Sequence, residues 1–228
     1  MTIKSLDPLL VLVLLMNLYI LTSTQLRAVV RAVALQGVLL ALAYPVAHFG
    51  GRVADSAAGG GDAWAVPRLI VLTLVMAAVK GAVIPWLLLK ALREVDIRRD
   101  EESTIGIVPA LLVGAVGTVL AMAFAARLPL RADDSSNLVV PAALATVFAG
   151  SVILTTRWRA LTQVLGYIVL ENGIFIFGLL LVDAIPSLVE LGVLLDLFVG
   201  VFVMGIIINH VSRAFGEASP THLKTLRD

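Results

Sequence analysis

The stretch ALTQVLGYIVLENGIFIFGLLLVD, residues 160–183, is a long apolar run with one glutamate, Glu171, near its centre. The nearest other charged residues are Arg159, just before the run, and Asp183, at its end. A helix rises ~1.5 Å per residue, so about 20 apolar residues cross the ~30 Å hydrocarbon core of a membrane. The run lacks the alternation of barrel strands. It therefore predicts a transmembrane helix that carries a carboxylate at mid-depth.

Six further runs of the same kind extend this prediction to the whole chain. The protein has 228 residues, of which 60% are hydrophobic and 14% are charged, whereas soluble domains carry roughly 25% charged residues. Its mean hydropathy is +1.01. We therefore predict an all-α integral membrane protein with seven transmembrane helices, at about 3–23, 27–48, 67–92, 104–126, 138–156, 160–183 and 187–211.

Composition also bounds the chemistry. The chain has no cysteine, which excludes disulfides and thiolate-bound clusters within it, and its three histidines are too far apart in sequence to suggest a metal site. It holds no basic cluster dense enough for a phosphate backbone, so nucleic acid is not an expected partner. No nucleophile–base arrangement, phosphate loop or dinucleotide fingerprint is present, so we identify no catalytic site and no cofactor site in this chain.

Lysine and arginine predict the orientation, because these residues favour cytoplasmic loops. One side of the predicted membrane would hold eleven basic residues and the other five, with Lys80 inside a span. The eleven are Arg27, Arg31, Lys90, Arg93, Arg98, Arg99, Arg157, Arg159, Arg213, Lys224 and Arg227; the five are Lys4, Arg52, Arg68, Arg127 and Arg131. We therefore expect the N-terminus outside and the C-terminus in the cytoplasm.

A weak internal similarity suggests a repeat. ILTSTQLRAVVRAVALQG, residues 20–37, and ILTTRWRALTQVLGYIVLENG, residues 153–173, both begin with ILT and end in a polar residue or pair followed by glycine. We accordingly divide the chain into a three-helix unit, a connecting helix 4 with its loop, a second three-helix unit and a cytoplasmic tail, a possible 3+1+3 parallel repeat. The respective ranges are 1–103, 104–137, 138–212 and 213–228.

Glu171 is the leading candidate for function. A lipid-exposed carboxylate at mid-depth costs at least ~2.5–3.5 kcal/mol, so the side chain is expected to face the bundle interior, where it can exchange a proton. Gln163, Tyr167 and Glu171 follow an i, i+4, i+8 spacing and share one helix face. They predict a polar stripe from the cytoplasmic end to mid-depth. The alternative is a neutral structural glutamate hydrogen-bonded between helices.

Lys80, in LVMAAVKGAVIPWLLLK, is the second anomaly, because it is too central in its span to reach an interface. Pro85 removes a backbone hydrogen bond to the Gly81 carbonyl and predicts a kink beside the lysine. Lys80 is then either a functional group in a lined interior position or a fixed counter-ion to a carboxylate on another subunit; the two are compatible.

The last predicted span contains two more carboxylates, Glu190 and Asp196. Glu190 lies near the outer end, where it is either part of a proton path or simply hydrated. Asp196 lies a turn and a half deeper and is the better candidate for a proton site.

Several of these stretches together resemble a known family. GYIVLENG, PSLVELGVLLDLFVGVFVM, AAVKGAVIPWLL and the basic tail THLKTLRD are similar to component E of hydrogenase-4, a membrane subunit of group 4 NiFe-hydrogenase and formate hydrogenlyase complexes. Spans 5–7 also resemble the small K-type subunit of bacterial complex I, in which a glutamate at the position of Glu171 belongs to the proton path. This chain has Ile174-Phe175 where component E commonly has Ser-His, which argues against a histidine relay there.

The resemblance implies a non-catalytic subunit of the prokaryotic inner membrane, in a complex that couples electron transfer to proton or sodium movement. Its implied partners are antiporter-like subunits, an H-type membrane subunit and a peripheral arm with iron–sulfur clusters, with or without a NiFe site. Two alternatives stay open. The chain could be a purely structural assembly subunit of that complex, or a component of a cation/proton antiporter.

Overall fold

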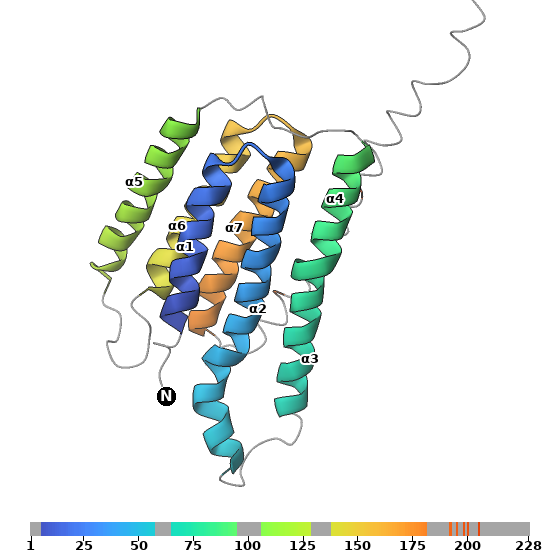
Figure 1. Ribbon diagram of the computed structural model, residues 1–228. Coiled ribbons are helices and arrows are strands. Elements are labelled where there is room, and N and C mark those ends of the chain that lie inside the picture. The colour runs from blue at the N-terminus through green and yellow to red at the C-terminus, as the bar shows by residue number, and fades with distance from the viewer. Residues whose placement is uncertain are drawn as a thin grey trace, which may run out of the picture.

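The computed structural model describes residues 6–57, 65–94, 106–128 and 138–181, together with five single residues between 192 and 205. Within these residues the regular elements are all helical, as the sequence predicts (Figure 1). They are α1 (Asp7–Thr22), α2 (Leu26–Ala57), α3 (Ala65–Ala78), the π-helical segment η2 (Val79–Val83), α4 (Ile84–Glu94), α5 (Ile107–Ala125), α6 (Val139–Thr156) and α7 (Ala160–Leu181).

Five described segments are long and apolar enough to cross a membrane. They are Leu26–Ala47, Pro67–Lys90, Ile107–Ala125, Val139–Thr156 and Leu161–Leu180, and they match five of the seven predicted spans. The first predicted span corresponds to α1, which is apolar but has only 16 residues. The seventh, at 187–211, lies outside the described residues apart from the single positions. The protein thus has the composition and helix lengths of a multi-pass membrane protein.

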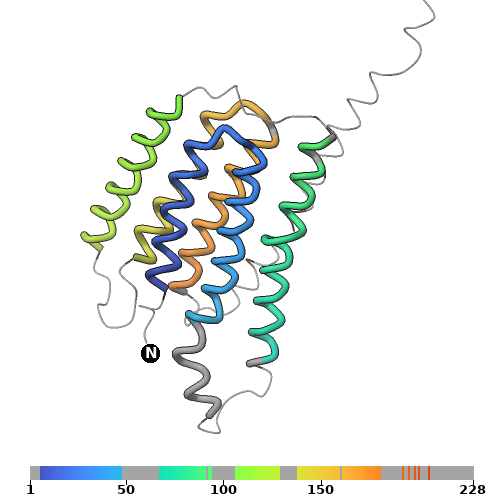
Figure 2. Tube along the Cα trace, viewed as in Figure 1, coloured from blue at the N-terminus to red at the C-terminus, as the bar shows by residue number. Residues whose placement is uncertain are grey.

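Four helices, α1, α2, α6 and α7, form the centre of the bundle (Figures 1 and 2). α5 lies on one side, against α1 and α6, and the rod made of α3, η2 and α4 lies on the other, against α2. α1 contacts α6 and α2 contacts α7. Helices from the ranges 1–103 and 138–212 therefore pack directly against each other in the described part of the protein.

Glycines allow α6 and α7 to approach at backbone distance. A Cβ atom on Gly173 would lie 2.6 Å from the backbone nitrogen of Val147, and one on Gly166 would lie 3.0 Å from the nitrogen of Leu154. Neither position has room for a side chain. In a membrane, where helices gain little from apolar burial, such close contact between small residues is a main source of helix association.

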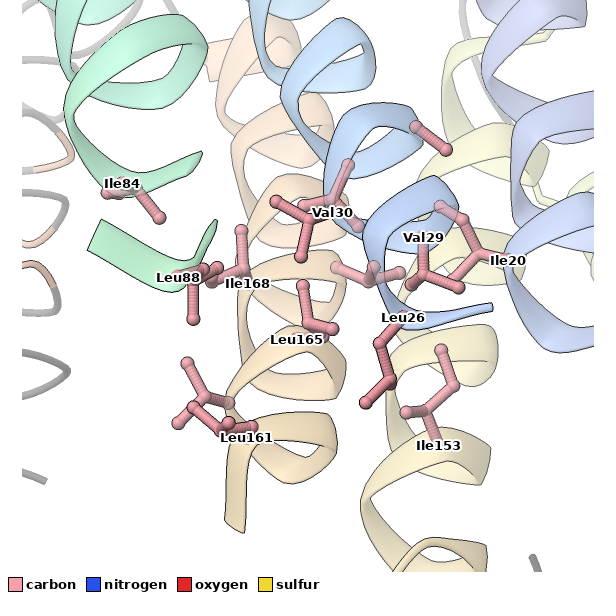
Figure 3. Packing of buried hydrophobic residues seen from close by; sticks show 14 of the residues in the cluster. Ile20, Leu26, Val29, Val30, Ile84, Leu88, Ile153, Leu161, Leu165 and Ile168 are labelled. Carbon is pink, nitrogen blue, oxygen red and sulfur yellow. The ribbon is translucent and has the colours of Figure 1, made fainter. Parts of the chain in front are cut away.

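Two apolar layers fill the bundle at different depths. One contains Val30 of α2, Ile84 and Leu88 of α4, and Leu165 and Ile168 of α7 (Figure 3). The other is built from a second set of buried side chains, among them Leu10, Leu14, Leu40, Ala145 and Ile176. Both layers consist of buried apolar side chains, so a polar group placed between them costs free energy unless it has a hydrogen-bond or ionic partner.

Candidate functional site: a buried polar layer between two apolar layers

Lys80 and Glu171 meet in the interior of the bundle. Nζ of Lys80 lies 3.6 Å from Oε1 of Glu171, and their side chains are only 3% and 6% exposed. The lysine comes from η2 and the glutamate from the middle of α7. The sequence allowed for a carboxylate on another subunit as the partner of Lys80. The structure instead supplies a carboxylate from the same chain.

A π-helical turn carries the lysine. The backbone N–H of Ile84 donates to the carbonyl of Val79, five residues back, which is the π-helical pattern. Pro85 follows directly and has no backbone N–H to donate, so the regular α-helical ladder cannot form there. The irregularity expected at this proline is thus an inserted π turn, which lies at Lys80 itself.

Two glycines let this turn sit directly on α2. A Cβ atom on Gly37 would lie 2.7 Å from Cβ of Lys80, and one on Gly81 would collide with Cγ2 of Val38. The pair makes a reciprocal contact between the two helices. The backbone of α2 therefore fixes the depth and direction of the lysine.

We expect Gly37→Ala to displace Lys80 and to lower the free energy of unfolding by about 1–3 kcal/mol, as over-packing of a filled interior does. Denaturant titration of the protein in detergent micelles measures this change. Gly106→Ala is the control, because its new Cβ would meet Pro109 Cδ at an ordinary 3.7 Å. It should cost less than about 1 kcal/mol. Equal losses in the two variants would contradict the close-contact explanation.

Beyond the ion pair, a chain of hydrogen bonds starts at the lysine. Nζ of Lys80 donates to Oδ1 of Asn172 at 3.1 Å. Nδ2 of Asn172 then donates to Oε1 of Gln36 at 3.4 Å. Lys80 and Asn172 are 92 positions apart in sequence, and Asn172 and Gln36 are 136 apart. The charged pair is therefore joined to α2 through Asn172.

The chain continues to α1 and α6. Nε2 of Gln36 donates to Oδ1 of Asn17 at 2.9 Å, and Nδ2 of Asn17 donates to Oγ1 of Thr146 at 2.8 Å. The hydroxyl of Thr146 donates in turn to the carbonyl of Ala142 at 2.6 Å, within its own helix. All of these polar side chains are at most 5% exposed. The network thus links α1, α2, η2, α6 and α7.

The network occupies one level between the two apolar layers. On α1, Asn17 separates Leu14 from Ile20, which belong to different layers. On the other helices, too, the polar side chains lie between a residue of one apolar layer and a residue of the other. The runs are Val33, Gln36 and Leu40 on α2; Ala145, Thr146 and Ala149 on α6; and Val169, Glu171, Asn172 and Ile176 on α7. We call the six side chains Asn17, Gln36, Lys80, Thr146, Glu171 and Asn172 the polar layer. Because its surroundings exclude water, each of its members depends on the others for hydrogen bonds.

Phe175 completes the surroundings of the lysine. The centre of its ring lies 5.2 Å from Nζ of Lys80, in the range of a cation–π contact. Phe175 is one turn beyond Glu171 on α7, so both side chains face the same way. Where the resemblance leads one to expect a histidine, this chain therefore presents an aromatic face that binds a cation and transfers no proton.

Two other predicted site residues, Gln163 and Tyr167, lie outside the polar layer. Gln163 and Tyr167 are exposed on α7, and Nε2 of Gln163 donates to the carbonyl of Arg157 at 3.3 Å. The predicted stripe thus changes from exposed to buried at Glu171. Glu190 and Asp196 lie outside the described residues.

Sequence reasoning missed Asn17 and Thr146, and it noted Gln36 only as part of the internal similarity. Asn17 and Gln36 are single amides in apolar runs, a signal that would have identified them. Thr146 gives no such signal, because threonines in apolar helices commonly bond to a carbonyl of their own helix, as Thr118 does to Gly114.

The chemistry available to this arrangement is proton exchange. An ammonium and a carboxylate 3.6 Å apart can share or transfer one proton with small movements of the side chains. Within the described ranges, no group of three or more His, Asp or Glu side chains could hold a metal ion. The polar layer is therefore a buried acid–base pair held in place by neutral amides.

Comparison with known proteins places the chain in a family. A protein of Mycobacterium tuberculosis, named Uncharacterized protein Rv0085, is 34% identical over 204 residues, which cover 89% of this chain and 87% of the mycobacterial protein. The chain belongs to the Rv0085 family. This member of the Rv0085 family is also similar, more distantly, to the Hydrogenase-4 component E of Escherichia coli (strain K12), with 26% identity over 167 residues, 72% of this chain and 76% of the relative. The protein of that name from Shigella flexneri gives the same values. No protein-family profile and no solved structure matches this Rv0085-family chain.

Proposed function

We propose that the chain is a membrane-arm subunit of a complex-I-like redox complex of the hydrogenase-4 type, and that its Lys80–Glu171 pair takes part in moving protons. The observation that carries the proposal is this ion pair, buried between η2 and the middle of the apolar helix α7. A buried pair is weak as a source of stability, because desolvation offsets most of its attraction. Its presence in a membrane helix bundle points instead to a role in ion movement. The distant similarity to Hydrogenase-4 component E supports the type of complex.

The proposed step is one proton transfer between the two side chains. In the ionic form Lys80 is an ammonium and Glu171 a carboxylate. When one proton moves from Nζ to Oε1, both groups become neutral and no net charge changes. A charge that arrives nearby in a partner subunit would shift the balance between the two forms, because the dry surroundings screen it weakly. The pair could thereby couple a distant event to proton uptake or release.

The wider assignment is part of the same proposal. The chain would cross the prokaryotic inner membrane seven times, with its N-terminus outside and its C-terminus in the cytoplasm. Residues 1–103 and 138–212 would form its two three-helix units. Antiporter-like subunits, an H-type subunit and an iron–sulfur arm would be its partners, and the redox cofactors would lie in the arm. Asp196 and Glu190 would extend the proton path beyond the pair.

Glu171→Gln in the assembled complex tests the function. The amide keeps the shape of the glutamate but cannot exchange the proton, so proton uptake per electron in inverted vesicles should fall about tenfold or more, as when a positioned acid–base group is lost. Glu171→Asp retains the carboxyl group and should restore part of the uptake. Full uptake in the glutamine variant, with normal electron transfer, would exclude the proton role.

A second function, a purely structural subunit, is favoured by the hydrogen bonding of the polar layer. All of its side chains have partners, and Gly37 and Gly81 fit the helices together without spare room. On this alternative Glu171→Gln leaves proton uptake unchanged, whereas Gly37 variants prevent the complex from assembling. The two functions therefore give opposite results for proton uptake in Glu171→Gln.

A further inference from the structure

The hydrogen bonds of the polar layer all run in one direction. Starting from Lys80, every donor points away from the lysine, towards Asn172, then Gln36, Asn17 and Thr146 in turn. The reason is the ammonium, which has donors and no acceptor. It must face the oxygen of Asn172, and this leaves the nitrogen of Asn172 to face the next oxygen. The charge on Lys80 thus sets the orientation of each following amide.

Thr146, at the far end of the hydrogen-bond chain, is compatible with either direction of hydrogen-bond donation. Thr146 has a hydroxyl group, which both donates and accepts and rotates freely. It now accepts from Asn17 and donates to the carbonyl of Ala142. It could instead turn and donate to Asn17. The primary amides between the two ends carry a donor and an acceptor at similar positions, so a half-turn of each exchanges them.

We propose that the amide chain Asn172–Gln36–Asn17 reverses its hydrogen-bond direction when Lys80 loses its proton, and so reports the charge of Lys80 to the contact between α1 and α6. A neutral amine has a lone pair and becomes an acceptor for Nδ2 of Asn172. Oδ1 of Asn172 is then free to accept from Gln36. This inference rests on the part of the proposed function in which Lys80 changes its charge.

The reversal then passes along the remaining links. Oε1 of Gln36 accepts from Nδ2 of Asn17, and Oδ1 of Asn17 accepts from the hydroxyl of Thr146, which leaves the Ala142 carbonyl. No covalent bond changes in these steps, because amides keep their protons. The hydrogen-bond chain transmits an orientation and carries no proton along its amides.

The charged groups around the chain are few in the described part of the protein. Glu171 on α7 faces Lys80 directly. α5 and α6 contain no charged residue, and α1 contains only Asp7, at its first position. On α2, Arg27 and Arg31 lie in the first two turns, well before Gln36, and Arg52 and Asp55 lie in the last two turns, well beyond it. The α3–η2–α4 rod carries Arg68, Lys90, Arg93 and Glu94 towards its ends, and Tyr44 is a buried phenol two turns beyond Gln36. Few other charged groups in the described part of the protein could therefore cause a change in the amide band of Gln36 when Lys80 loses its charge.

Gln36 is a convenient reporter because it lies within the hydrogen-bond chain, bonded to Asn172 and to Asn17. We suggest infrared difference spectra of the full chain in lipid nanodiscs, with ¹³C-labelled glutamine side chains, for the step from neutral to alkaline pH. The protein has three glutamines. Gln25 and Gln163 lie outside the polar layer and serve as internal controls. We expect one shifted amide band, absent in Gln36→Leu, which assigns it, and absent in Lys80→Met.

The decisive variant is Asn172→Leu, which cuts the link between Lys80 and Gln36 while the Lys80–Glu171 pair remains. Loss of the Gln36 band shift supports transmission along the chain. A shift that persists overturns the proposal, because it would be a through-space effect of the charge. Thr162→Val is the matched control, since Thr162 is buried on α7 with a hydroxyl that has no partner in the structure; it should keep the shift. If Asn172→Leu does not fold, Asn172→Ala cuts the same link.

A separate spectral region distinguishes this inference from the proposed function. The step from neutral to acid pH should show the carboxyl band of Glu171, which Glu171→Gln removes. Absence of that band contradicts proton exchange at Glu171, the proposed function. Its presence without any shift of Gln36 in wild type leaves that function standing and overturns the reversal alone.

Discussion

Lys80→Met is expected to lower the free energy of unfolding by about 3–5 kcal/mol, the typical cost of removing one partner of a buried ion pair. Methionine fills a similar volume, so the cost arises from charge and not from a cavity. The remaining carboxylate of Glu171 has no ammonium beside it, and Asn172 loses a charge-assisted hydrogen bond. Thermal or denaturant unfolding in detergent measures the change.

The double variant Lys80→Met/Glu171→Gln identifies the origin of that cost. Because it leaves no unpaired charge, it should lose less stability than the sum of the two single variants, by an interaction energy of about 0.5–3 kcal/mol. Additive losses would mean that the pair does not interact, despite its 3.6 Å separation. Lys90 is exposed on α4 with its ammonium over the ring of Trp86, so Lys90→Met should change stability by no more than about 1 kcal/mol.

Gln36→Leu is the second large expected effect. Leucine removes the acceptor for Nδ2 of Asn172 and the donor for Oδ1 of Asn17 at the centre of the polar layer. Each buried polar group left without a partner costs about 1–3 kcal/mol, so the free energy of unfolding should fall by about 2–6 kcal/mol.

A matched glutamine on the surface provides the comparison. Gln163→Leu removes an exposed side chain with one 3.3 Å hydrogen bond to a backbone carbonyl, and should cost no more than about 0.5 kcal/mol. Similar losses at positions 36 and 163 would contradict the view that the polar layer is a dry, mutually dependent network.

Much of the fold follows from the sequence, because lipid permits few backbone structures. Five long apolar helices lie where the apolar runs predict them, and the first run forms the shorter α1. The burial of Lys80 and Glu171 was also predictable, since a charge at mid-depth must avoid lipid. Gln163 and Tyr167 show the limit of such reasoning. Helical spacing places them in line with Glu171, but which residues of that line are buried depends on the helices that pack against it.

The sequence by itself determined that this protein has the long apolar helices of a membrane protein and charged residues within them, Lys80 and Glu171 among them, because hydropathy over about 20 residues is a local property. Only the tertiary structure decided that the two charges meet and that Asn17, Gln36, Thr146 and Asn172 join them in one layer. Asn17 and Thr146 are 129 positions apart, and each looks ordinary in its own helix. The network as a whole depends on helix packing in which Gly37, Gly81 and Gly173 allow η2 to approach α2 and α7 to approach α6, and that packing involves surfaces from several helices at once.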